Sequence, residues 1–147
     1  MRSIEEQEVV DRTTISEIYA QSGISSEYMT ITCPYDIQST GDNKVFCTEV
    51  KMFSKDYPKH IIKKEKMDRM LEASKGKGLV YAVICSSSNT VYFYNCHKID
   101  WSSIECRPMK QLKSQFNPSK GSYVKDVYFI PRELAILTRP IPNIIQT

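Results

Sequence analysis

Apolar and polar residues recur with two different periods along this chain, and the change of period divides it into helices and strands. From Ser3 to Ser22 the spacing is helical, and the apolar stripe consists of Val10, Ile15, Ile18 and Tyr19. Ser3 followed by Glu6 three residues later is the capping-box arrangement that begins helices, and Gly23 provides a stop. The sequence therefore predicts a first helix over residues 3–22.

Three strand-like runs follow this helix. They extend from Glu27 to Cys33, from Tyr35 to Ser39 and from Lys44 to Phe53. The triplet Gly41-Asp42-Asn43, just before the third run, contains residue types that favour tight turns. Three consecutive strands with short connections indicate an antiparallel meander.

A second helix is predicted within KKEKMDRMLEASKGKG, residues 63–78. Its apolar residues Met67, Met70 and Leu71 fall at i, i+3 and i+4, and Glu65 and Arg69 are spaced to pair along the helix. Two apolar runs follow, from Leu79 to Cys85 and from Thr90 to Asn95, and these are typical of buried neighbouring strands.

The pattern weakens after Trp101. The segment from Tyr123 to Ile130 is a further strand candidate, and Pro131 is a candidate start for a short helix through Leu137, before an extended tail. With 147 residues and 41% hydrophobic content, we expect one domain over residues 1–147, with its core in residues 3–100 and a C-terminal extension over 101–147.

Charge and cysteine content narrow the class of protein. The net charge is +3, and lysines outnumber acids between Lys51 and Lys77, so a phosphate-rich partner would be attracted to that region. The five cysteines lack a CxxC spacing, which favours reduced thiols, and His60 and His97 lie in contexts that give little support for zinc. The acidic N-terminus resembles no signal peptide, and no apolar run reaches membrane length. We expect a soluble, cytoplasmic protein without membrane contact.

Asp36, Glu49 and Lys51 are the candidate chemical residues. Glu49 and Lys51 are two apart in a strand, so they project from one face, and the turn lets the strand near Asp36 fold back beside them. Two carboxylates and an ammonium group would then converge, which suits a divalent metal ion next to a phosphate. The same spacing also fits a solvent-facing ion pair, which contributes at most about 1 kcal/mol.

The order of these elements resembles that of the PD-(D/E)XK nuclease superfamily, which has the restriction-endonuclease-like fold. The similarity covers residues 3–100, and the motif reads Pro34-Tyr35-Asp36 and then Glu49-Val50-Lys51; the first half is one residue longer than the minimal Pro-Asp. The chain is most similar to small members such as the Holliday-junction resolvases, the Mrr-type nucleases and short nucleases of phages and mobile elements. The resemblance implies an α/β fold in α-βββ-α-ββ order, with a mixed central sheet flanked by helices.

The resemblance also implies roles for individual residues. Asp36 and Glu49 would bind Mg²⁺ or Mn²⁺ together with the main-chain carbonyl of Val50. Lys51 would orient the attacking water or stabilise negative charge that develops on the phosphate. Many members add an acid from the first helix, which here would be Asp11, with Glu8 and Glu17 as alternatives.

Further residues are candidates for substrate contact. Lys63 and Lys64 are placed to contact backbone phosphates, and Gln38 shares a strand face with Asp36. For each of these residues, and for Asp11, a solvated side chain is the alternative interpretation.

The sequence favours a metal-dependent endonuclease that acts on DNA. Junction cleavage would require a homodimer with two sites. A nucleic-acid- or protein-binding module that retains the fold without turnover is the alternative, and a structural or inhibitory phage-type protein is a third class.

Overall fold

The computed structural model describes residues 3–30, 32–112 and 121–142 of the chain. Helix α1 (Ile4–Gln21) begins at Ser3, whose side chain accepts a hydrogen bond from the Glu6 N–H while the Glu6 carboxylate accepts one from the Ser3 N–H. The helix ends before Gly23, which has φ +77° and therefore lies in the left-handed region that glycine tolerates best. The predicted helix, its capping box and its stop are confirmed.

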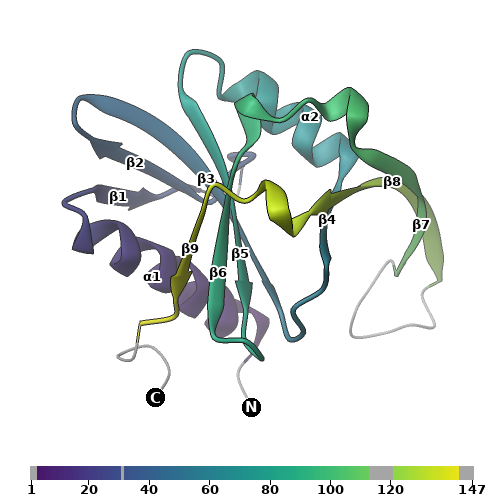
Figure 1. Cartoon of the computed structure of the whole chain (residues 1–147), viewed down its shortest axis with the longest axis horizontal. Coiled ribbons are helices and arrows are strands. Elements are labelled where there is room, and N and C mark those ends of the chain that lie inside the picture. The colour runs from purple at the N-terminus through teal and green to yellow at the C-terminus, as the bar shows by residue number, and fades with distance from the viewer. Residues whose placement is uncertain (1–2, 31, 113–120, 143–147) are drawn as a thin grey trace.

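A six-stranded mixed sheet, with strand order β1-β2-β3-β5-β6-β9, forms the centre of the molecule (Figure 1). Its strands are β1 (Ser25–Tyr28), β2 (Ile37–Gly41), β3 (Lys44–Phe53), β5 (Gly78–Cys85), β6 (Thr90–Asn95) and β9 (Leu137–Pro140). β3 and β5 pair in parallel, and the other neighbours pair antiparallel. Helix α1 lies on one side of this sheet and helix α2 (Lys64–Ala73) on the other (Figure 1). The predicted α/β fold, a mixed central sheet flanked by helices, is confirmed.

The connection between β2 and β3 is the predicted tight turn. Gly41 pairs with Lys44, and the two residues between them, Asp42 and Asn43, have φ values of +49° and +62°. Positive φ at both central positions is the geometry of hairpin turns whose twist matches that of the strands. The turn therefore fixes the register in which β2 lies against β3.

The predicted bounds of the first two strands are wrong. β1 ends at Tyr28 and not at Cys33, and one residue of the predicted run, Ile31, lies outside the described residues. β2 begins at Ile37, so Asp36 lies in the bend that precedes the strand. The physical reason is strand pairing. The residues of β2 that pair with β3 run from Ile37 to Gly41, next to the turn, and the ladder between β1 and β2 likewise begins at Ile37 and Tyr28.

A second sheet of three strands, in the order β4-β8-β7, packs beside α2. Its strands are β4 (Lys59–Lys63), β7 (Glu105–Leu112) and β8 (Ser122–Pro131). β8 confirms the predicted strand, whereas the sequence did not predict β4 or β7. Strands therefore make up most of the part of the C-terminal extension that the structure describes, residues 101–112 and 121–142.

The helix predicted to run from Pro131 through Leu137 is wrong. A single 3-10 turn (Arg132–Leu134) is followed by β9, which pairs with β6 at the edge of the large sheet. The Ile136 N–H donates to the Phe93 carbonyl at 2.8 Å, so pairing with the sheet replaces the helical hydrogen bonds.

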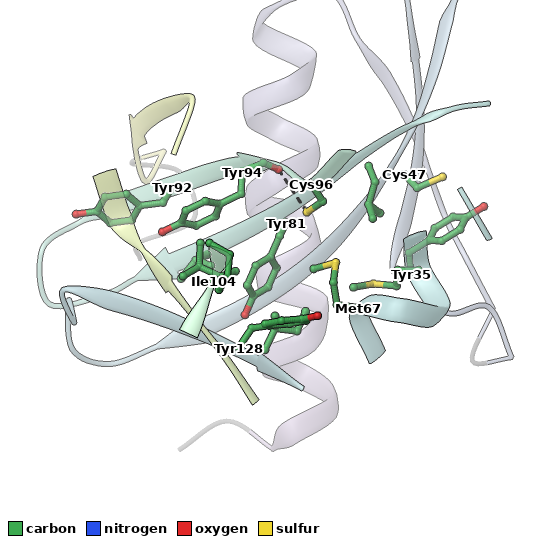
Figure 2. Close-up of a cluster of buried hydrophobic side chains, with 14 of the residues drawn as sticks. Tyr35, Cys47, Met67, Tyr81, Tyr92, Tyr94, Cys96, Ile104 and Tyr128 are labelled. Atoms are coloured by element: carbon green, nitrogen blue, oxygen red, sulfur yellow. Dashed lines mark hydrogen bonds between the residues drawn. The ribbon is translucent and has the colours of Figure 1, made fainter. Parts of the chain in front are cut away.

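Two buried clusters cover the two faces of the large sheet. On one face, α1 contributes Ile15, Ile18 and Tyr19, which pack against β-strand side chains. On the other face, α2 and the second sheet pack against residues such as Cys47 and Tyr81. Figure 2 shows Tyr81 pointing from β5 towards Tyr128, with Met67 beside them. Within the described ranges, no helix is long and apolar enough to cross a membrane.

Candidate active site

The bend before β2 fixes Asp36 at the end of the β2–β3 ladder. Its backbone N–H donates to the Thr48 carbonyl at 3.0 Å, and its Oδ2 accepts a hydrogen bond from the Val50 N–H at 2.8 Å. Extending the pairing of Ile37 with Thr48 by one residue places Asp36 opposite Glu49. The backbone of β3 therefore holds the half-buried Asp36 side chain next to the Glu49 position.

Glu49 projects from β3 onto the sheet face that α2 covers. Side chains alternate along a strand, so Glu49 shares this face with Cys47, which belongs to the cluster around α2. Only 5% of Glu49 is exposed, and its Oε2 lies 2.5 Å from Nζ of Lys66 on α2. Burial, followed by the neighbouring Asp36 charge, raises the pKa of Glu49 from 4.5 to about 8, and Lys66 offsets part of this effect. The ionised carboxylate is therefore costly at this position and would be stabilised by further positive charge.

Glu49 and Lys51 both line a pocket of about 200 Å³ between the two sheets. The lining side chains come from both sheets and from α2, and they are Glu49, Lys51, Phe53, Ile61, Ile62, Lys63, Lys66, Tyr81, Gln111 and Val127. Three of them are lysines and one is an acid. A pocket with several ammonium groups around one buried carboxylate is suited to an anionic group such as phosphate.

Two residues of this pocket were missed by sequence reasoning. Lys66 lies four residues before the buried Met70, so both occupy the face of α2 that is turned towards the sheet, and this spacing was a usable signal. Tyr81 pairs with Glu49 in the β3–β5 register, and its hydroxyl donates to the Ile61 carbonyl at 2.8 Å. Tyr81 gave no signal of its own, because an aromatic residue in an apolar strand usually belongs to the core.

The predicted substrate-contacting lysines differ in their surroundings. Lys63 lines the pocket, and its Nζ donates to the Tyr123 hydroxyl at 3.2 Å. Lys64 forms an exposed ion pair with Asp68 at 2.6 Å. The structure therefore brings Lys63, but not Lys64, to the pocket that contains Glu49.

Gln38 and Asp11 occupy different sides of the sheet. Gln38 pairs with Cys47, and its Oε1 accepts hydrogen bonds from the Tyr35 hydroxyl at 3.2 Å and from Lys77 Nζ at 3.4 Å. Asp11 lies on α1, which packs on the face opposite Glu49, and its Oδ1 accepts a hydrogen bond from Gln7 at 2.8 Å. A role for Asp11 in the site stays a prediction.

The donors around Asp36 and Glu49 fit a divalent cation. Carboxylate oxygens are the ligands that Mg²⁺ and Mn²⁺ prefer. A cation here would offset both the cost of burying the ionised Glu49 carboxylate and its repulsion by Asp36. Thr48 and Val50 direct their backbone groups to the same side of β3, and β2 begins opposite Thr48. The Val50 carbonyl therefore lies just past the end of the β2 ladder, beside Asp36.

Comparisons with known proteins identify the fold. Neither a protein-family model nor a curated protein matches this sequence. Among solved structures, the chain is similar to Hjc, a Holliday junction resolvase from the archaeal hyperthermophile Archaeoglobus fulgidus. The TM-score is 0.56 at 10% sequence identity, and the match covers 92% of this chain and 97% of that chain. At this identity the similarity shows the fold alone, which is the fold that the sequence resemblance to the PD-(D/E)XK superfamily implied.

Proposed function

We propose that this protein is a metal-dependent endonuclease that hydrolyses nucleic-acid phosphodiester bonds, with DNA as the favoured substrate. One observation carries the proposal. A buried Glu49 carboxyl group with a raised pKa lies beside Asp36 and shares one pocket with Lys51 and Lys66. A carboxylate pair that a cation would stabilise, next to ammonium groups that can receive a phosphate, is suited to metal-dependent phosphodiester hydrolysis.

We assign the roles that the family resemblance implies, and the positions of the groups support them. Asp36 and Glu49, with the main-chain carbonyl of Val50, would hold one Mg²⁺ or Mn²⁺. When bound, such an ion supplies Lewis-acid polarisation of the phosphoryl oxygen and lowers the pKa of a water molecule. Lys51 would orient the attacking water or offset the negative charge that grows on the phosphate. Lys66, freed from Glu49 once that carboxylate binds the cation, would add a second ammonium group to the same pocket.

The surroundings of the pocket favour recognition of DNA shape. Lysine side chains contact phosphates, which position a nucleic acid without reading its sequence. The shared fold with a Holliday junction resolvase supports branched DNA as the preferred substrate. Resolution of a four-way junction requires two cuts, so we propose that two copies of the chain act together on it.

Cleavage of supercoiled plasmid tests the proposal. We expect nicking with Mg²⁺ or Mn²⁺ and none with EDTA. Glu49→Ala and Lys51→Ala should each reduce the rate by about a hundredfold or more, because the first removes a ligand of the cation and the second removes an ammonium group beside the reacting phosphate. Lys75→Ala is the matched control, since Lys75 forms an exposed ion pair with Glu72 away from the pocket.

Two results would contradict this proposal. Equal nicking by wild type and both variants would show that the site is assigned to the wrong residues. Binding to a four-way junction without cleavage, in either metal, would instead support the non-catalytic binding module. Comparing four-way, forked and linear DNA at several salt concentrations then separates shape preference from general phosphate attraction.

A further inference from the structure

A second group of metal-ligating side chains lies away from the candidate active site. Asp56 from the β3–β4 connection, His60 from β4 and Cys85 from the end of β5 bring one ligand atom each to within 4.8 Å of one another. Cys85 is four residues beyond Tyr81, the strand partner of Glu49, which corresponds to about 13 Å along the strand. The group therefore lies well away from Glu49, near Phe53, which lines the pocket and pairs with Cys85.

The distances within this group match tetrahedral zinc ligation. Nε2 of His60 lies 3.6 Å from Sγ of Cys85 and 3.8 Å from Oδ1 of Asp56. A tetrahedral Zn²⁺ with typical bond lengths separates a nitrogen and a sulfur ligand by about 3.6 Å, and a nitrogen and an oxygen ligand by about 3.4 Å. The nitrogen and sulfur ligands are already at the required separation, and Asp56 would move closer to both when an ion binds, since the three ligand atoms now lie within 4.8 Å of one another.

Neighbouring hydroxyl groups orient these ligands. Nδ1 of His60 lies 2.5 Å from the Tyr94 hydroxyl, which leaves Nε2 turned towards Cys85 and Asp56. The Tyr92 hydroxyl donates to Oδ2 of Asp56 at 2.6 Å, so that Oδ1 is the oxygen that faces His60. Hydrogen bonds of this kind, from the far side of each ligand, are characteristic of metal sites.

Oδ1 of Asp56 faces Arg132 and the other two ligand atoms. Oδ1 is buried and has no hydrogen-bond partner within the described part of the chain, although Arg132 lies 3.2 Å away as an ion pair. His60 and Cys85 are likewise buried. Three donor atoms thus converge on one point that Arg132 borders.

We propose that Asp56, His60 and Cys85 form a site for a transition-metal ion of the Zn²⁺ class. The Cys85 thiol would release its proton to solvent and bind as the thiolate, and a water molecule would complete the tetrahedron. The thiolate and the Asp56 carboxylate together neutralise the ion, so Arg132 would leave Oδ1. The ion would join the β3–β4 connection to the end of β5, which makes the site structural and independent of the proposed nuclease chemistry.

Cobalt titration of the full chain tests this site directly. Co²⁺ bound by a thiolate gives a sulfur-to-cobalt charge-transfer band, and tetrahedral Co²⁺ absorbs strongly in the visible range. We expect one Co²⁺ per chain with both features, displaced by an equal amount of Zn²⁺. Mg²⁺ should leave the bands unchanged, because the carboxylate site near Glu49 contains no thiol.

Variants identify the ligands. Cys85→Ser should abolish the charge-transfer band, whereas Cys33→Ser and Cys106→Ser, which alter thiols outside the group, should retain it. Tyr94→Phe should weaken metal affinity by about 10- to 100-fold through loss of the His60 contact. Circular dichroism confirms that each variant is folded before titration.

Arg132→Gln keeps the proposal testable even if the buried variants unfold. Because Arg132 competes for Oδ1 and its side chain is 42% exposed, its removal should tighten metal binding without unfolding the chain. The proposal is wrong if the folded wild type gives no charge-transfer band, if the band persists in a folded Cys85→Ser variant, or if Arg132→Gln weakens binding.

Discussion

Replacing the Glu49 carboxylate by an amide should stabilise the metal-free protein. The pKa of Glu49 is about 8 in the folded state against an ordinary value of 4.5, with burial as the largest cause and the Asp36 charge next. Between these two values the folded state holds a proton that the unfolded state has lost. The ionisation of Glu49 therefore leaves the free energy of unfolding unchanged below pH 4.5 and lowers it as the pH rises towards 8. Glu49→Gln imitates the protonated form and should escape this loss.

The size of the effect follows from the same two values. Each pH unit in this window costs about 1.4 kcal/mol, so the penalty is roughly 3 kcal/mol at pH 7 and less than about 1 kcal/mol at pH 5. We expect Glu49→Gln to exceed the wild type by roughly these amounts in the free energy of unfolding. Saturating Mg²⁺ or Mn²⁺ should stabilise the wild type and leave the variant unchanged, because the amide cannot replace an anionic ligand.

Urea denaturation at pH 5, 6, 7 and 8, with EDTA or with Mn²⁺, measures these differences. Asp68→Asn is the matched control, because Asp68 forms an exposed ion pair with Lys64 on the same helix as Lys66, and its loss should change stability by less than about 1 kcal/mol. If Glu49→Gln is no more stable than the wild type at pH 7, burial and the Asp36 charge do not destabilise the ionised Glu49 carboxylate. If the variant responds to Mn²⁺ as the wild type does, the cation binds elsewhere.

Three further predictions concern the fold and the substrate. Tyr19→Phe removes a buried hydrogen bond of 2.8 Å to the Thr48 hydroxyl, so urea denaturation should show a loss of about 1–2 kcal/mol, and an unchanged midpoint would refute this. Gly78→Ala places a Cβ atom 2.8 Å from Cβ of Phe46 in the neighbouring strand, and the melting temperature should fall by an amount equivalent to about 1–3 kcal/mol; a rise would show that β3 and β5 are more adaptable than the structure indicates. Lys63→Ala should weaken binding to every DNA tested and lower the slope of log affinity against log salt by about one, whereas an effect on one sequence only would argue for base contact.

Local signals in the sequence were sufficient for much of the fold. The capping box at Ser3 and the turn at Asp42 and Asn43 depend on residues within four positions of each other, so their chemistry is visible without tertiary structure. The same is true of Glu49 and Lys51, since strand alternation alone predicts that they share a face. Both side chains do line one pocket in the structure, while their catalytic roles stay a proposal.

Elements that depend on distant pairing were not predictable in the same way. In β4, a lysine stands at each end of a strand of only five residues, and the buried positions are His60 and Ile62. Such a short run beginning after Pro58 resembles a loop until β8 pairs with it from more than sixty residues away. The convergence of His60 with Cys85 has the same origin, because it depends on how β4 is folded back against the large sheet. A sequence pattern gives no information about such an approach.

Lys66 shows a different limit of prediction from the sequence. A lysine on a helix surface is normally solvated, and the sequence offered Lys63 and Lys64 as equal candidates for substrate contact. What distinguishes Lys66 is the burial of Glu49, which makes a cationic partner necessary at that point of the helix face. The spacing of Lys66 from Met70 indicates which face of the helix it occupies, but only the position of Glu49 on the sheet shows that this lysine has a buried acidic partner.

Anomalous diffraction from crystals soaked in Mn²⁺ tests the central claim most directly. We predict a peak about 2 Å from carboxylate oxygens of both Asp36 and Glu49, with Lys66 Nζ displaced from its position on Glu49. No peak at these carboxylates at saturating Mn²⁺, with Lys66 still paired to Glu49, would contradict a metal-dependent nuclease site in this protein.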